Sequence, residues 1–99
     1  MDYVEKADRN RRLVVLRALE KENDGRLNES LISRQLDAFG HAMSRAEVRE
    51  LLRWLEGRDA IRVTMAGDTV MVAEITQAGA DHVARRGKPI DGIDLPSRI

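Results

Sequence analysis

The sequence predicts an α+β domain that is mostly helical, with a three-helix core, a β-hairpin and a C-terminal helix. Three observations predict it. Apolar residues recur at helical spacing through most of the first 57 positions. The connection at 40–43 is short enough to join two helices by a tight turn. After position 59 the apolar spacing changes to two, as in β-strands, and helical spacing returns after position 76. This order of elements is that of a winged helix-turn-helix.

The first half of the chain predicts two helices and a minimal strand. The first helix covers about Tyr3–Glu22, and the turn residues Asn23–Gly25 end it. The dipeptide Arg26-Leu27 is long enough for a very short strand. Asn28 is a favourable N-cap for a second helix over about Glu29–Phe39, which Gly40 ends.

The third helix has the clearest start signal in the chain. Ser44 and Glu47 have the spacing of a capping box, with serine at the N-cap and glutamate at the third helical position. The helix runs to about Gly57, and its apolar side consists of Val48, Leu51, Leu52 and Leu55. Polar residues lie on its other sides, so we expect a helix with one buried face and one charged face.

A β-hairpin and a last helix follow. Alternating residues over Ala60–Met65 and Thr69–Ile75 predict two strands joined by the turn Ala66–Asp68. Thr76 is a suitable cap for a helix over about Gln77–Arg86, with Gly87 as its stop. We therefore assign residues 1–87 to the winged-helix domain. Residues 88–99 are expected to form a flexible tail, because Pro89, Gly92 and Pro96 break any regular pattern.

Composition limits the function classes. The 99 residues suffice for one domain and include no cysteine, which excludes disulfides, thiolate metal sites and cysteine catalysis. His41 and His82 lack a third ligand at zinc-like spacing. With no catalytic constellation and no phosphate-binding loop, we expect no enzyme activity, no cofactor or metal, and no small-molecule substrate. No stretch is apolar enough for a membrane span or a signal peptide, so we expect a cytoplasmic protein.

The helix-turn-helix arrangement points to double-stranded DNA as partner, because a helix with a free polar face fits the major groove. The candidate contacts are Ser44, Arg45, Arg49 and Arg53 on the third helix and Arg62 at the base of the hairpin. The alternative for these side chains is a solvated helix surface with local ion pairs. Net charge is zero, with 17 basic and 17 acidic residues, which is unfavourable for binding phosphates.

A homodimer through the terminal helices is a further expectation, since a two-fold pair doubles the length of a recognised site. The first helix carries a second stripe opposite Leu16, and small apolar residues there could meet another subunit or simply face solvent. The stripe consists of Ala7, Arg11, Val14 and Ala18, and the stretch Ala80–Ala84 would complete the interface.

Two segments carry a resemblance to a known group of proteins. Leu51–Ile61 resembles the end of a recognition helix and its passage into the wing in winged-helix regulators, and Ile75–Gly79 resembles their strand-to-helix junction. Over about Asp2–Arg86 the chain is similar to small winged-helix, ArsR-like proteins of Mu-like prophages. The resemblance implies a phage or prophage transcriptional regulator. Metal sensing is not carried over, because the cysteines that it needs are absent. The alternative function is a winged-helix protein–protein interaction module in a phage complex, without DNA binding.

Overall fold

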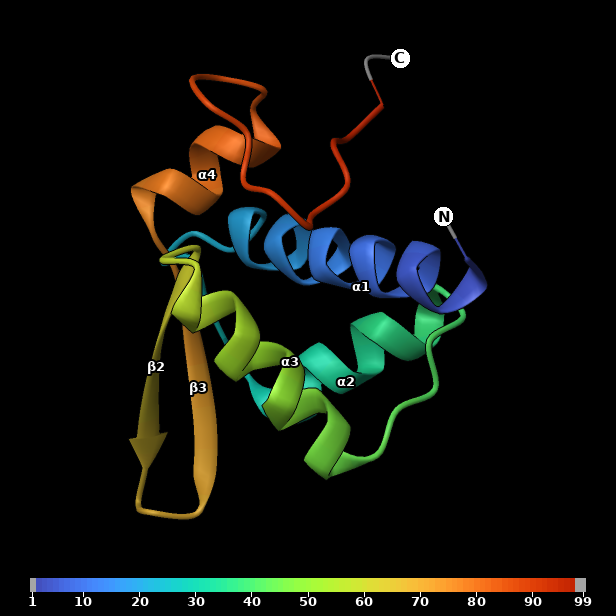
Figure 1. Ribbon diagram of the computed structural model, residues 1–99. Coiled ribbons are helices and arrows are strands. Elements are labelled where there is room, and N and C mark those ends of the chain that lie inside the picture. Colours follow the sequence, from blue (N-terminus) through green and yellow to red (C-terminus); the bar gives the residue numbers. More distant parts are fainter. Residues whose placement is uncertain (1, 98–99) are drawn as a thin grey trace.

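The computed structural model describes residues 2–97, which form four helices and a three-stranded antiparallel sheet (Figure 1). The elements are, in chain order, α1 (Tyr3–Glu20), β1 (Arg26–Asn28), α2 (Glu29–Ala38), α3 (Arg45–Gly57), β2 (Ile61–Ala66), β3 (Val70–Ile75) and α4 (Gln77–Val83). This is the predicted winged helix-turn-helix, including the minimal strand β1. The first and last helices end two or three residues earlier than predicted.

Side-chain caps set the starts of the helices, because the first backbone N–H groups of a helix have no partner inside it. Asn28 accepts a hydrogen bond from the N–H of Leu31, and Thr76 accepts one from Gly79. Ser44 accepts from the N–H of Glu47 at 3.2 Å, and the Glu47 carboxylate accepts from the N–H of Ser44 at 2.8 Å. The capping box predicted at the start of α3 is therefore confirmed.

The sheet joins the hairpin to the helical body. Strand β3 lies in the middle, with β2 and β1 on either side, and its register runs from Ile61 opposite Ile75 to Ala66 opposite Val70. Gly67 and Asp68 both have positive φ and are the central residues of a tight turn that the N–H of Thr69 closes onto the carbonyl of Ala66 at 3.2 Å, with Thr69 as an extra residue before the pair Ala66–Val70. We call residues 61–75 the wing and residues 66–70 the wing tip. Figure 1 shows that the tip is the end of the wing farthest from α1.

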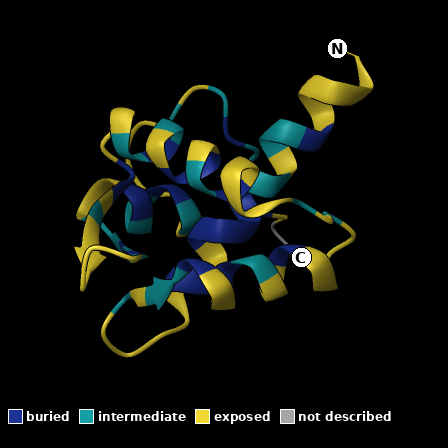
Figure 2. Cartoon of the chain, turned by 90° about the horizontal axis from the view of Figure 1, so that it is seen from below, coloured by how far each residue is buried: buried dark blue, intermediate teal, exposed yellow. Residues whose placement is uncertain are grey.

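One apolar core joins the helices to the sheet. Figure 2 shows buried residues on the sides of the helices that face one another and exposed residues on the outer sides. The largest fully buried apolar side chains are Leu16, Leu19, Ile32, Leu36, Leu52, Leu55, Ile61 and Ile93. Leucine and isoleucine dominate because the chain has only three aromatic residues, and Trp54 is half-buried at the edge of the cluster.

The apolar residues of the second stripe of α1 pack inside the domain. Ala7, Val14 and Ala18 are all buried within the chain, because α1 has α2 on one side and α4 with the C-terminal segment on another. Of the stretch Ala80–Ala84, His82 is buried and Val83 packs against the core. The α1 part of the expected dimer interface is therefore wrong, because the domain uses Ala7, Val14 and Ala18 for its own packing, whereas Ala84 at the end of α4 is exposed.

The C-terminal segment also differs from the expectation of a flexible tail. Residues 88–97 turn back over α1 and α4 (Figure 1), and Ile93 enters the core with 2% of its surface exposed. The buried His82 ring accepts from the N–H of Ile90 at 3.0 Å and lies 2.9 Å from the carbonyl oxygen of Asp94. Arg12 donates to the carbonyl of Gly92 at 2.9 Å. The rest of the predicted tail, residues 98–99, lies outside the described residues.

Candidate nucleic-acid interface

Helix α3 has three distinct sides. Val48, Leu51, Leu52 and Leu55 are buried against the body. Ala46, Glu50 and Arg53 are exposed on the opposite side, as the helical period of 3.6 residues requires. Between these two sides lies a flank that faces the wing, and it carries Arg45 and Arg49. The outward face is thus more acidic than predicted, and the two arginines lie beside the wing rather than at the centre of that face.

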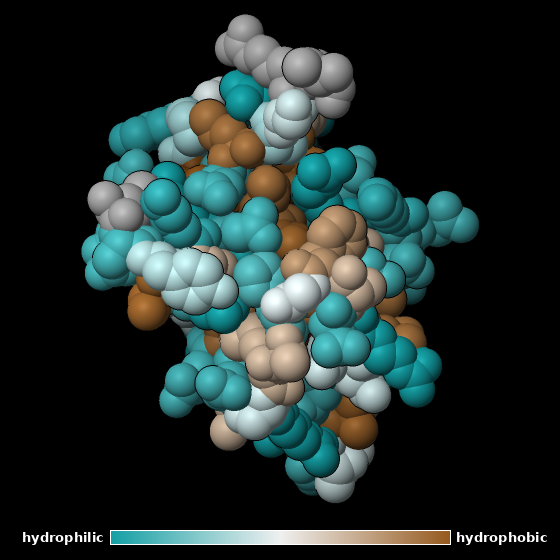
Figure 3. All heavy atoms as spheres, turned by 90° about the vertical axis from the view of Figure 1, so that its right-hand side faces the viewer, coloured by the Kyte–Doolittle hydropathy of each residue, from teal (hydrophilic) through white to brown (hydrophobic). Residues whose placement is uncertain are grey.

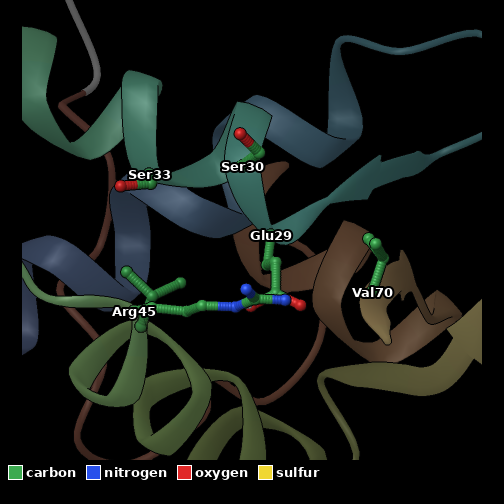
Figure 4. Close-up of a pocket in the computed structure, with 6 residues that line it drawn as sticks. Glu29, Ser30, Ser33, Arg45 and Val70 are labelled. Carbon is green, nitrogen blue, oxygen red and sulfur yellow. The ribbon is translucent and has the colours of Figure 1, made fainter. Parts of the chain in front are cut away.

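A buried carboxylate holds these two arginines. Glu29 is the first residue of α2, and only 6% of its side chain is exposed. Arg45 donates from Nε to Glu29 Oε1 at 3.0 Å. Arg49 makes a forked pair, from Nε to Oε1 and from Nη2 to Oε2, both at 2.8 Å. The backbone N–H of Met71 on β3 donates to Oε2 at 2.5 Å. Figure 4 shows Arg45 of α3 and Glu29 of α2 pointing toward each other.

The same arginines also hold the wing tip. Nη2 of Arg45 and Nη2 of Arg49 both donate to the carbonyl oxygen of Thr69, at 2.7 and 2.9 Å. One cluster of hydrogen bonds therefore joins α2, α3 and the wing. We call Glu29, Arg45, Arg49, Thr69 and Met71 the wing cluster.

The wing cluster favours the charged form of its carboxylate. The pKa of Glu29 is lowered from 4.5 to about 2, chiefly by the hydrogen bond from Arg49 and also by those from Met71 and Arg45, against the opposing effect of burial. The same bond raises the pKa of Arg49. Glu29 thus stays ionised at neutral pH, and the local charge of the cluster is one positive unit rather than two.

This shift predicts a stability loss in acid. Because the folded pKa of Glu29 lies below its ordinary value, its contribution is complete above about pH 4.5 and is lost as pH falls toward 2. Urea unfolding of the wild type and of Glu29→Gln at a series of pH values measures the effect. The difference in unfolding free energy between the two proteins should be largest near neutral pH and shrink below pH 4.5. A difference that stays constant down to pH 3 would contradict the ionised buried carboxylate.

The remaining predicted contacts lie apart from the cluster. Arg53 is half-exposed and donates to Glu56 at 2.9 Å on the same helix, as the ion-pair alternative expected. Ser44 is exposed but its hydroxyl is occupied in the capping box. Arg62 is exposed on β2, opposite Glu74 and four residues before the last residue of that strand, which places it about 13 Å from the tip.

An open pocket of about 340 Å³ lies beside the wing cluster. Its lining combines hydroxyl, charged and apolar side chains from α2, α3 and β3: Glu29, Ser30, Ser33, Arg45, Val48 and Val70 (Figure 4). Sequence reasoning missed Glu29, because its partners are 16, 20 and 42 positions away in the chain. Its position directly after the N-cap Asn28 explains why an acidic residue is favourable there, at the start of a helix. That position gives no sign that arginines from another helix bind it.

Other predicted features have structural roles. Trp54 lies under two guanidinium groups, those of Arg12 at 3.8 Å and Arg58 at 4.6 Å from the ring centre, so it is a packing residue. Nε2 of His41 donates to Oδ1 of Asn10 at 2.8 Å, and partial burial lowers the pKa of His41. Residues 2–97 contain no group of three or more histidine or acidic side chains placed to hold a metal ion. No helix among them is long and apolar enough to cross a membrane.

Comparison with known proteins finds relatives in a bacterium and in a bacteriophage. No family model matches it. An uncharacterised protein of Haemophilus influenzae is 43% identical over 77 residues, which cover 78% of this chain and 74% of that protein. A crystal structure named as that of a "putative dna-binding protein" from Ralstonia eutropha JMP134 superimposes with a TM-score of 0.64 at 23% identity, over 86% of this chain and 95% of its own, and so supports the fold. The uncharacterised protein gp26 of Escherichia phage Mu is 34% identical over 87 residues, 88% of each chain. The chain belongs to the family of phage Mu gp26.

Proposed function

We propose that this protein binds double-stranded DNA with the start of α3 and the wing tip, as a phage or prophage transcriptional regulator of the cytoplasm and not as an enzyme. The observation that carries the proposal is the state of Arg45. Its side chain is 64% exposed, although Nε and Nη2 are held in the wing cluster. Among the contacts within residues 2–97, Nη1 has no hydrogen-bond partner, so its two N–H groups are free to donate to a ligand. An arginine held in this way is preorganised to donate hydrogen bonds to a phosphate or to the edge of a guanine base.

The surroundings of Arg45 support the same role. It is the first residue of α3, and in helix-turn-helix proteins the start of the second helix meets the base edges. Ser30 and Ser33 line the pocket beside it, and serine hydroxyls can donate to a phosphate. Arg49 takes a different part: its Nε and Nη2 both bind Glu29, and only 33% of its side chain is exposed. Of the predicted contacts, Arg45 is therefore the primary candidate.

A second candidate function is protein binding within a phage complex. Zero net charge, Glu50 and Glu56 on α3, and Asp68 in the turn of the wing favour it, because all of these repel phosphate. A homodimer also belongs to the first proposal, since two copies would read two half-sites. Its interface would need surfaces other than the buried stripe of α1.

Exposed apolar residues for such an interface lie at the start of α1 and the end of α2, namely Tyr3, Val4 and Phe39. Figure 3 shows the side of the molecule on which these helix ends lie. Hydrophobic atoms on this side lie in separate groups among hydrophilic residues. This surface is small for a stable interface, so we expect dimerisation to depend on simultaneous binding to DNA.

Titration of a labelled random duplex at two salt concentrations tests the proposal. We expect weak binding at low salt that falls steeply as salt rises. Arg45→Ala should weaken it about tenfold and lower the salt slope by about one. Arg53→Ala should have a smaller effect, because Glu56 already neutralises that side chain.

Glu50→Gln, on the outward face of the same helix, serves as the control and should tighten binding slightly. Unchanged affinity in Arg45→Ala would contradict the role of Arg45 as a DNA contact, and no binding at low salt would favour the protein-binding alternative.

A further inference from the structure

We propose that Glu29 is a positioning residue for DNA recognition: it fixes Arg45 and the wing tip against α3, so that they meet a duplex as one rigid unit. The inference rests on the proposed function and deepens it. Glu29 itself is buried and cannot touch DNA. Its effect on recognition would therefore act entirely through the groups that it holds.

The carboxylate of Glu29 is saturated by its present partners. An ionised carboxylate offers about four acceptor positions. Here four donor groups occupy them: Nε of Arg45, Nε and Nη2 of Arg49, and the backbone N–H of Met71. These donors come from α3 and β3, whereas Glu29 belongs to α2. A single side chain thus determines how three elements lie relative to one another.

The wing tip depends on this cluster for its position. Between Val72 and its tip the wing is a two-stranded hairpin, because β1 pairs with β3 only over Val72–Glu74, and such a hairpin is marginally stable by itself. Among residues 2–97, the side-chain hydrogen bonds to residues 66–70 come from Arg45 and Arg49, both to the carbonyl of Thr69. Glu29 orients both guanidinium groups toward that carbonyl. Without its carboxylate the two arginines would repel each other, and the tip would lose its fixed distance to α3.

Electrostatics alone predicts the opposite effect of removing Glu29. Glu29→Gln deletes one negative charge beside the candidate interface and releases two arginines, so non-specific binding to phosphates should become tighter. A positioning role instead predicts a loss of discrimination between sequences, because base readout needs a guanidinium held in place whereas a phosphate accepts a mobile one. The ratio of affinities for a preferred and a scrambled duplex separates the two effects. This ratio is also insensitive to partial unfolding, which reduces both affinities equally.

The experiment uses duplexes enriched from a random library by the wild-type protein, together with scrambled controls. We measure the affinity ratio for the wild type, Glu29→Gln, Glu29→Asp and Glu50→Gln. Glu29→Asp keeps the charge but withdraws the carboxylate by about 1.5 Å, the length of one carbon–carbon bond. We expect the affinity ratio of both Glu29 variants to be about tenfold lower than that of the wild type. A tenfold change is what the loss of one well-placed base contact produces. Glu50→Gln, which removes an exposed charge outside the cluster, should keep the wild-type ratio.

The possible results distinguish failure of the positioning role of Glu29 from failure of the proposed DNA recognition. If the wild type discriminates and both Glu29 variants keep its ratio, the positioning role is overturned while DNA recognition stands. If Glu29→Gln and Glu50→Gln change the ratio equally, the effect is one of charge, and the positioning role is again overturned. If the wild type enriches no duplex, the proposed sequence-specific function fails, and the inference fails with it.

Discussion

Gly79→Ala is expected to destabilise the protein by about 3 kcal/mol, although alanine is the better residue inside a helix. Gly79 lies in α4, where a Cβ atom would be 2.3 Å from the carbonyl oxygen of Ala60 and 2.9 Å from Cγ1 of Ile75. The carbonyl cannot move away easily, because it accepts the N–H of Thr76 at 3.1 Å. Helix α4 would have to shift away from the wing base, and the fully buried Ala60 would lose its packing.

Gly57→Ala is the matched control. Gly57 is the last residue of α3, and a Cβ atom there meets nothing within 4 Å. This substitution should stabilise the protein by about 0.5–1 kcal/mol through helix propensity and a less flexible unfolded chain. Urea unfolding followed by circular dichroism measures both. Two changes of the same kind are thus expected to have opposite signs, and equal signs would contradict the close approach of α4 to Ala60.

Local signals account for most of what could be predicted of the fold. The capping box at Ser44, the caps Asn28 and Thr76, and the tight turn at Gly67 each depend on residues within a few positions. Gly79 is an instructive case. Its position after a capping threonine is visible in the sequence, but the reason for glycine there is the carbonyl of Ala60, 19 positions away, which only the folded chain brings close.

The candidate site was predicted less completely, because its arrangement depends on distant partners. The helical period of α3 correctly separates arginines from leucines. It does not show that Arg45 and Arg49 turn toward the wing, since the attraction comes from Glu29 on another helix and from a backbone carbonyl in the hairpin. Burial of Glu29 becomes favourable only when all its acceptor positions are filled, and that is a property of the assembled fold.

The error about the C-terminal segment has a related origin. Pro89, Gly92 and Pro96 exclude a regular helix or strand, and a flexible tail follows from them only if irregular backbone is also flexible. Irregular backbone can still be fixed when its side chains enter the core and its polar groups find partners. Gly92 shows this directly: its φ is +88°, and a Cβ atom would lie 2.9 Å from the ring of Trp54. The breaks in the pattern permit a close approach to α3 rather than preventing order.

Removal of residues 88–99 is therefore expected to cost at least about 4 kcal/mol, a large part of the 5–15 kcal/mol typical of a domain. The deletion uncovers the site of Ile93, an apolar slot in the core. It also leaves the buried ring of His82 without the N–H of Ile90 and the carbonyl of Asp94. An unsatisfied buried polar group adds a penalty of about 1–3 kcal/mol to the lost packing.

Two point variants measure the packing part of this effect. Ile93→Ala should cost about 2–4 kcal/mol, as expected for a fully buried isoleucine, whereas Leu95→Ala, at a position 41% exposed, should cost less than about 1 kcal/mol. Because the segment covers α1 and α4 while the wing tip projects from the other end of the molecule (Figure 1), Ile93→Ala should leave discrimination between duplexes unchanged at temperatures where it is folded. A truncated protein as stable as the wild type would mean that the core ends at α4, and that the contacts of Ile93 and His82 contribute nothing to folding.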